Sequence, residues 1–495
     1  MTNNIKITQK PTLFLDKILN IYKDVLFNMS KPIQKKDIEP YIPRILKRYE
    51  YTSPTLPITP KCIIERVYQI REFKKSIAAL DKVPRIEQKS PEWHAIRKNL
   101  ISASDFGNAL NRGMMKDKSL QELYKKKCGY EVEEPNDKAK EIMGRGCMLE
   151  DIVVMLYEHK RKIKIYDYGL IPYEKDRRFG ASPDGVSEYG QCIEIKCPYM
   201  RKMDGKIPFY YYCQVQGQME ICGFEETDYI ECDFHDYSNS FEFDNDYDED
   251  TNLYSKDIKD KGILIGYKKL EDGDSAFDNN YKYSPIGLNR DEIYKWRDSE
   301  LLKLKENPNI RQDTIDIRYW KLNNMLIQRL YKDQEFIDAM MKELDFVHNE
   351  IQRYKKDSFA YDLEVQKNGR AVKRQAKVAT IKLNTPVFSP VYRPYIKEED
   401  QIVLDNGVCG ALNDGKEEEQ NDKLALGYPH ESDMVVSPHR YGTDNKVFKE
   451  ILKKEKNVEK ALIQKKFDKE KEEQNINSIM DDCNNDNAYP FIDMN

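Results

Sequence analysis

Two hydrophobic periods alternate along the chain, and the change from one to the other predicts where helices and strands lie. Apolar residues recur at helical spacing in several segments, which predicts helices over 14–27, 63–80, 141–162, 210–222 and 290–355. Residues 91–110 predict a helix and then a second helix start at S-A-S-D-F-G (102–107), with Ser102 or Ser104 as the candidate N-cap. Short runs rich in β-branched and aromatic residues predict strands over 166–173, 227–234 and 262–268, and a hairpin formed by 179–186 and 191–198. This order of elements predicts an α/β fold in which a central mixed sheet is flanked by helices, with helical extensions.

The same pattern divides the chain into three regions. Residues 1–85 predict an N-terminal helical extension, and 86–356 predict the main α/β core. Within this core, residues 235–255 form an acidic insertion, and like charges at this density favour a solvated loop. The periodicity weakens from residue 357 onward, so 357–495 predict a weakly structured, charged C-terminal region.

Composition argues against a membrane-spanning, a secreted or an iron–sulfur protein. Charged residues make up 34% of the 495 positions, against about 25% in an average soluble protein. The chain contains no apolar run of about 18 residues, so we expect no membrane helix, and its first residues lack a signal-peptide core. The ten cysteines are scattered from Cys62 to Cys483 without a CxxC pair, which predicts reduced thiols in an intracellular compartment and no iron–sulfur cluster.

The candidate chemistry lies on the predicted hairpin, where S-P-D-G (182–185) is followed by E-I-K (194–196). Side chains alternate between the faces of a strand, so Glu194 and Lys196 share one face, and the hairpin brings Asp184 beside them. Oxygen ligands converging in this way suit Mg²⁺, with Mn²⁺ as a substitute, and the carbonyl of Ile195 is a further candidate ligand. The alternative for this pattern taken alone is a surface hairpin carrying an ordinary Glu–Lys pair.

The neighbouring motifs favour the first reading. In chain order they are W-x-x-x-R (93–97), S-A-S (102–104), G-x-x-x-E (146–150), S-P-D-G (182–185), E-x-K-C-P (194–198) and Y-x-x-Q-V-Q (211–216). This ordered set resembles the YqaJ-type viral recombinase and lambda-type exonuclease family, a branch of the restriction-endonuclease-like PD-(D/E)XK nucleases. The resemblance covers roughly residues 90–235, and it extends more loosely to about 345.

The resemblance implies a role for each matching residue. Asp184 and Glu194 correspond to the metal ligands, with Glu150 assisting, and Lys196 corresponds to the catalytic lysine. Gln214 and Tyr211 correspond to the helix that supports the site. Arg97, Ser104 and Ser182 match the positions that hold a terminal 5′-phosphate. We expect Trp93 to pack in the core and the amides of Gln216 and Gln218 to be satisfied helix residues.

The functional prediction is a Mg²⁺-dependent deoxyribonuclease. We expect this enzyme to be an exonuclease that acts on duplex DNA ends, in recombination or DNA processing by a large DNA virus. Two alternatives stay open: a structure-selective endonuclease with the same site, and a DNA-binding or scaffold module that does not cut. DNA is the expected partner, with a single-strand annealing protein, a helicase or a second copy of the chain as further candidates. The expected location is the host cytoplasm or the virion.

Overall fold

The computed structural model describes residues 11–52, 58–83, 85–86, 90–115, 118–130, 136–199, 201–273 and 278–367. Most of the predicted C-terminal region therefore lies outside the described residues. Within them the chain forms two compact units. Of the described residues, the first unit contains those up to His235, those within 271–279 and 322–367; the second contains Asp236–Leu270 and Asn280–Lys321. Among the described residues, no helix combines the length and apolarity needed to span a membrane.

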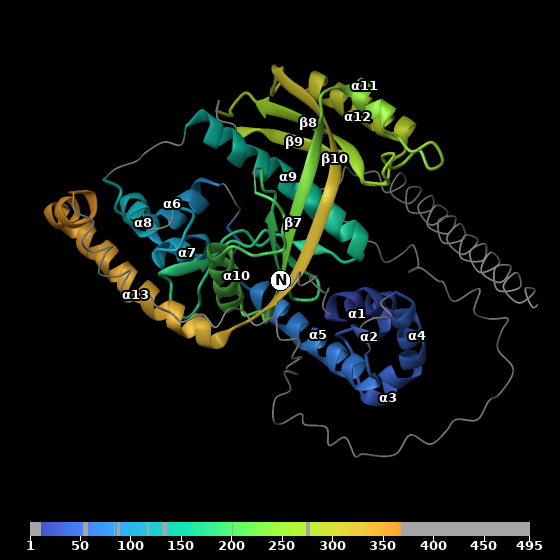
Figure 1. The fold of residues 1–495 in the computed structure, drawn as a ribbon, viewed down its shortest axis with the longest axis horizontal. Helices are drawn as coiled ribbons and strands as arrows, with labels where there is room; N and C mark the ends of the chain where they lie inside the picture. The colour runs from blue at the N-terminus through green and yellow to red at the C-terminus, as the bar shows by residue number, and fades with distance from the viewer. Residues whose placement is uncertain are drawn as a thin grey trace, which may run out of the picture. The chain divides into compact units, whose positions relative to one another are not determined.

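The first unit is built on a mixed sheet (Figure 1). Its strands run in the order β2-β5-β6-β7-β10, where β5 pairs antiparallel and β7 pairs parallel with β6. The bounds are β2 (Ile165–Tyr166), β5 (Gly185–Ser187), β6 (Cys192–Lys196), β7 (Glu226–Tyr237) and β10 (Ile310–Tyr331). A small second sheet has the order β1-β4-β3, from β1 (Ile101–Ser102), β4 (Phe179–Ala181) and β3 (Ile171–Pro172). The predicted α/β fold class with a central mixed sheet is confirmed.

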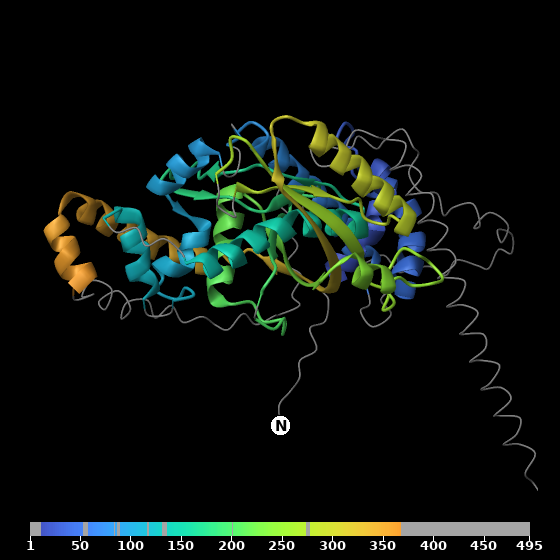
Figure 2. The same cartoon turned by 90° about the horizontal axis from the view of Figure 1, so that it is seen from above.

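Helices make up the rest of this unit (Figures 1 and 2). The N-terminal ones are α1 (Pro11–Leu19), α2 (Lys23–Leu26), α3 (Lys35–Ile38), α4 (Ile42–Thr52) and α5 (Pro60–Leu80). The others are α6 (Pro91–Asn99), α7 (Phe106–Ala109), α8 (Ser119–Cys128), α9 (Asp137–Arg161), α10 (Phe209–Cys222), α13 (Gln334–Lys356) and α14 (Ser358–Tyr361). The largest apolar cluster joins α7, α8, α10 and α13 to the strands.

Helices α9 and α10 cover opposite faces of the sheet. Tyr229 on β7 packs with Val215 of α10, whereas its neighbour Asp228 accepts a hydrogen bond from Tyr157 of α9 at 2.5 Å. Adjacent strand residues point to opposite faces, so the two helices must lie on different sides. Helix α10 also lies close to α7. At Gly217 there is no room for a larger residue, since a Cβ there would lie 2.4 Å from the Phe106 ring.

A buried ionic network ties the N-terminal helices to the sheet. Arg66 of α5 donates to Asp16 of α1 at 2.7 Å and to Glu226 of β7 at 2.7 Å. Arg329 of β10 bonds Asp228 at 2.7 Å and also pairs with Asp16. Burial alone would raise the pKa of Asp16, but the two arginines hold it well below its ordinary value. The N-terminal helices are therefore joined to the core by charge as well as by apolar contact.

The second unit contains the first half of β10 with β8 (Lys261–Lys269) and β9 (Asn280–Tyr283), in the order β10-β8-β9. Its helices are α11 (Ser240–Asn245) and α12 (Arg290–Glu306). The prediction of a solvated loop over 235–255 is wrong for much of this segment, because its aromatic residues enclose a lysine. Lys261 Nζ lies 3.8 Å from the ring centroid of Tyr247 and 4.1 Å from that of Phe243, and it donates to the Phe243 carbonyl at 2.6 Å.

Two other sequence expectations are wrong. The predicted helical stretch 290–355 consists of α12, the 22-residue strand β10 and α13. Pro308 cannot continue a helix, and Asp333 caps the start of α13 by accepting a hydrogen bond from the Phe336 N–H. The predicted strand 166–173 is split between β2 and β3, because the chain turns at Gly169 with φ +63°.

We predict that Arg66→Ala lowers the free energy of unfolding by about 3–5 kcal/mol, because it leaves the buried carboxylates of Asp16 and Glu226 with one arginine fewer. Lys61→Ala is the matched control on the same helix. Its partner Glu65 is 3.8 Å away, and the lysine side chain is 63% exposed, so we expect little change. Urea denaturation measures both variants, and equal midpoints would contradict a role for the buried network.

Candidate active site

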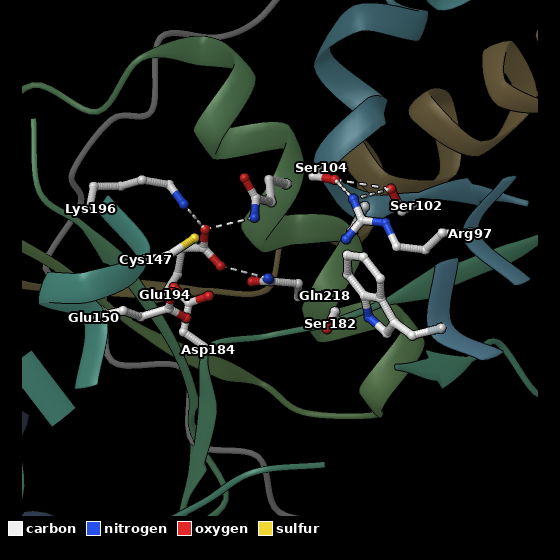
Figure 3. Close-up of a pocket in the computed structure, with 13 residues that line it drawn as sticks. Arg97, Ser102, Ser104, Cys147, Glu150, Ser182, Asp184, Glu194, Lys196 and Gln218 are labelled. Carbon is white, nitrogen blue, oxygen red and sulfur yellow. Dashed lines mark hydrogen bonds and ion pairs between the residues drawn. The ribbon is translucent and has the colours of Figure 1, made fainter. Parts of the chain in front are cut away.

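One cavity of about 210 Å³ gathers most of the predicted site residues (Figure 3). The predicted residues that line it are Arg97, Ser104, Glu150, Ser182, Asp184, Glu194, Lys196 and Gln214. They come from α6, the turn after β1, helix α9, the loop before β5, strand β6 and helix α10. Tyr211 and Ile195, also predicted for the site, are not part of this lining.

Glu194 lies at the centre of the acidic end of the cavity. It is completely buried on β6, and it forms an ion pair with Lys196. Two amides of α10 hold the same carboxylate: Gln214 Nε2 donates to its Oε1 and Gln218 Nε2 to its Oε2, each at 2.6 Å. Positions 214 and 218 are one helical turn apart, so both side chains reach the same face of α10. Burial, followed by the nearby Asp184, raises the pKa of Glu194 to about 7.

Asp184 reaches this group from the loop before β5. The hairpin pairs Gly185 with Ile193, and the Ile195 N–H donates to Asp184 Oδ2 at 2.6 Å. Burial, followed by the charge of Glu150 on α9, raises the pKa of Asp184 well above its ordinary value. The backbone of Ile195 therefore contacts Asp184 through its N–H.

The three carboxylates give the cavity a surplus of negative charge, with Lys196 as the neighbouring cation. Burial would lower the pKa of Lys196, but Glu194 and Asp184 raise it, so the lysine stays protonated. Within the described part of the chain, no three His, Cys, Asp or Glu side chains stand close enough together to form a metal-binding group. In this arrangement the Glu194 oxygens face Lys196 and the two amides.

The other end of the cavity is cationic and rich in hydroxyls. Arg97 donates to Ser104 Oγ at 2.8 Å and to Ser102 Oγ at 3.2 Å, and its guanidinium lies 4.4 Å from the Trp93 ring centroid. Burial lowers the pKa of Arg97, with a smaller opposite effect from Asp105. This guanidinium forms no ion pair with a described carboxylate, so it has capacity for an anion.

A buried lysine holds the backbone of Arg97 in place. Lys127 of α8 donates to the backbone carbonyls of Arg97 at 2.9 Å and Leu100 at 2.7 Å, and it pairs with Asp105 at 2.9 Å. Asp105 also accepts from Ser102 Oγ at 2.9 Å and closes the capping box that Ser102 begins. Ser102, one of the two predicted caps, is thus the N-cap here, whereas the roles of Lys127 and Asp105 were not predicted from the sequence.

Several residues differ from their predicted surroundings. Tyr211 packs with Val215 and Tyr229, and Lys196 Nζ lies 4.9 Å from its ring centroid. Ser182 lines the cavity, but its hydroxyl donates to the Gly169 carbonyl at 3.0 Å. The sequence analysis missed Gln218, Cys147 and Ser102 as lining residues. The i+4 spacing of Gln218 from Gln214 was the signal that could have found it.

The family model of the YqaJ-like viral recombinase domain matches residues 92–225, which confirms the predicted resemblance for this segment. An uncharacterized protein of Acanthamoeba polyphaga mimivirus is 25% identical to this chain over 357 residues. The match covers 67% of this chain and 62% of that protein, so the chain spans less than two thirds of its viral relative.

Two solved structures show a weaker similarity. An alkaline exonuclease from Laribacter hongkongensis is 18% identical, with a TM-score of 0.32, and the match covers 54% of this chain and 95% of the other. A phage-related exonuclease from Haemophilus somnus is 13% identical, with a TM-score of 0.28, and the match covers 52% of this chain and 96% of the other.

We predict that Asp184→Asn raises Tm by a few degrees at pH 8 in EDTA. The pKa of Asp184 is higher in the folded chain than its ordinary 3.8, so the contribution of this carboxyl to stability is greatest below pH 3.8 and falls as pH rises and the group ionises. The asparagine removes that loss, and the gain should shrink toward pH 4.

Asp176→Asn is the control, and we expect it to lower Tm at pH 8. Hydrogen bonds from Arg178 lower the pKa of Asp176, so its ionised form is stabilising at that pH. Thermal denaturation across pH 4–8 measures both variants. An unchanged or lower Tm for Asp184→Asn at pH 8 would contradict the proposed carboxylate repulsion.

Proposed function

We propose that this protein is a metal-dependent DNA nuclease that digests duplex DNA from its ends. The proposal starts from the match of residues 92–225 to the YqaJ-like viral recombinase domain. The observation that carries the proposal is the pairing of two chemistries in one cavity. Carboxylates with a lysine lie at one end, and a guanidinium with hydroxyls lies at the other. DNA carries a phosphate at every nucleotide, so one strand can occupy both ends at once.

The carboxylates fit a divalent cation better than they fit one another. The raised pKa values of Asp184 and Glu194 mean that their negative charges are poorly compensated, and hard cations prefer oxygen ligands. Asp184 and Glu194 would hold Mg²⁺ or Mn²⁺ directly, with Glu150 assisting through the waters of the ion and the Ile195 carbonyl as a further candidate ligand. When bound, such an ion lowers the pKa of water and offsets the charge on the phosphate.

Lys196 contributes to hydrolysis as a fixed positive charge. Its ammonium stays protonated beside Glu194, so it can stabilise the negative charge that builds on the phosphate oxygens during attack. Gln214 and the Tyr211 ring hold this lysine and its carboxylate in place. These residues orient the scissile phosphate while water displaces the sugar oxygen.

Arg97, Ser104 and Ser182 would bind the terminal 5′-phosphate. A guanidinium offers several donors to phosphate oxygens, and neighbouring hydroxyls add more. The Trp93 ring packs against the Arg97 guanidinium, and Lys127 holds the backbone carbonyl of Arg97. A terminal phosphate held there would fix which phosphodiester reaches the carboxylates. The enzyme would then cut at a constant distance from the DNA end.

The match to the YqaJ-like viral recombinase domain supports a role in viral recombination or DNA processing, and the mimivirus relative supports a location in the cytoplasm of an infected host or in the virion. A single-strand annealing protein, a helicase or a second copy of the chain are the protein partners that such a role would use. A structure-selective endonuclease and a non-cutting DNA-binding module are the competing functions.

The decisive experiment is a cleavage assay on linear and circular duplex DNA. We expect linear DNA to be digested with Mg²⁺ or Mn²⁺, and activity to vanish in excess EDTA. We expect Lys196→Ala to lose at least about 10²-fold in rate, because it removes a partner of the transition-state charge. Lys206→Ala is the control, since this lysine side chain is 87% exposed. Undiminished cleavage in EDTA would overturn the metal mechanism, and cutting of circular DNA alone would favour the endonuclease.

A second prediction concerns end recognition. Arg97→Ala should slow digestion of 5′-phosphorylated linear duplex roughly ten- to hundredfold more than that of 5′-hydroxyl duplex, because the lost hydrogen bond is charge-assisted. Arg85→Ala is the matched control, because Arg85 stacks on Tyr168 at 4.6 Å outside the cavity. Initial rates on both substrates measure the effect. Equal slowing on the two would mean that Arg97 makes a general contact instead of an end-specific one.

A further inference from the structure

Gln218 carries an unsatisfied polar atom inside the candidate active site. Its side chain is completely buried, and its Nε2 donates to Glu194 Oε2 at 2.6 Å. Its Oε1 is also buried but has no hydrogen-bond partner among the described residues. Burying an acceptor without a partner is unfavourable, so this amide oxygen requires a donor that the protein itself does not supply.

Gln216, another glutamine of α10, has no such requirement. Gln216 is equally buried, but its Nε2 donates to the Tyr331 carbonyl at 2.9 Å and its Oε1 accepts from the Asp333 N–H at 2.8 Å. Both ends of that amide are satisfied, and it joins α10 to the end of β10. The unsatisfied oxygen of Gln218 is therefore not a general property of the helix.

The position of Gln218 identifies the kind of donor that would satisfy it. Its side chain lies between Glu194 and the Arg97–Ser104 pair and lines the same cavity (Figure 3). The oxygens of a phosphodiester carry no proton, so the DNA phosphate cannot donate to Oε1. The lysine and arginine of the cavity already donate to Glu194 and to the serine hydroxyls. A water molecule is small enough and has the O–H group that the amide oxygen lacks.

We propose that Gln218 Oε1 accepts a hydrogen bond from the water that attacks the phosphodiester, and so orients it; this inference rests on the nuclease function proposed above. With one O–H directed at Gln218, a lone pair of the water is free to face phosphorus. That lone pair forms the new P–O bond. The bond from phosphorus to the leaving sugar oxygen breaks and its electron pair stays on that oxygen. The proton lost by the water is exchanged through solvent, and the sugar oxygen ends as a hydroxyl.

The test replaces the amide with a side chain of similar size that cannot accept the bond. We expect Gln218→Met to lower kcat on linear duplex roughly ten- to hundredfold with little change in KM, because DNA binding through Arg97 is unaffected. We expect Ca²⁺ alone to raise the Tm of the wild type and of this variant by the same amount, because the carboxylates are retained. The matched control Gln216→Met should show the opposite pattern, a lower Tm with kcat of the folded protein unchanged.

Each outcome decides the proposal. A wild-type kcat in Gln218→Met would overturn it, and so would loss of the Ca²⁺ effect, which would make Gln218 a support for the metal ligands. If the methionine variant does not fold, Gln218→Asn retains an amide but withdraws the oxygen by one methylene, and the same loss of kcat is expected. If the wild type does not cleave DNA, the nuclease function fails and this inference with it. Wild-type cleavage with an undiminished variant rejects the inference alone.

Discussion

A carboxylate sealed away from water, next to two others, is the constraint on which the rest of this structure depends. Glu194 is completely buried, and both Asp184 and Glu150 are close enough to influence the charge of the cavity. Such a group is stable only where donors surround it. Strand β6 supplies Lys196, and α10 supplies two amides, which requires α10 to lie close against the sheet. On its other side α10 lies close to α7, where Gly217 leaves room for the Phe106 ring.

The local part of this arrangement was predictable from the sequence. Strand alternation placed Glu194 and Lys196 on one face, and a short hairpin brought Asp184 beside them, because both depend on neighbouring residues alone. The support around Arg97 was not predictable, since Lys127 reaches it from another helix. The strand β10 was missed because its mixture of apolar and charged residues fits a helical period, and only its pairing with β8 decides the matter.

The errors on Gln218 and the acidic segment share one physical cause. Residue type was taken as a guide to environment, so glutamines were expected to be satisfied and a run of acids to be solvated. In the fold, the environment depends on what the opposite element brings: a buried carboxylate faces Gln218, and Lys261 draws Phe243 and Tyr247 inward. Such pairings across distant segments have no local signature in the sequence.

The ionic network beneath the sheet has a consequence for the order of folding. Asp16 and Arg329 are 313 residues apart, so the network is incomplete until nearly all of β10 has been synthesised. At about 5–20 residues per second, a ribosome needs roughly 15–60 s to cover that interval. During this time Arg66 is the only one of the two arginines present to balance Asp16 and Glu226. The buried carboxylates of Asp16 and Glu226 therefore gain their second arginine only when β10, one of the last described strands, has been made.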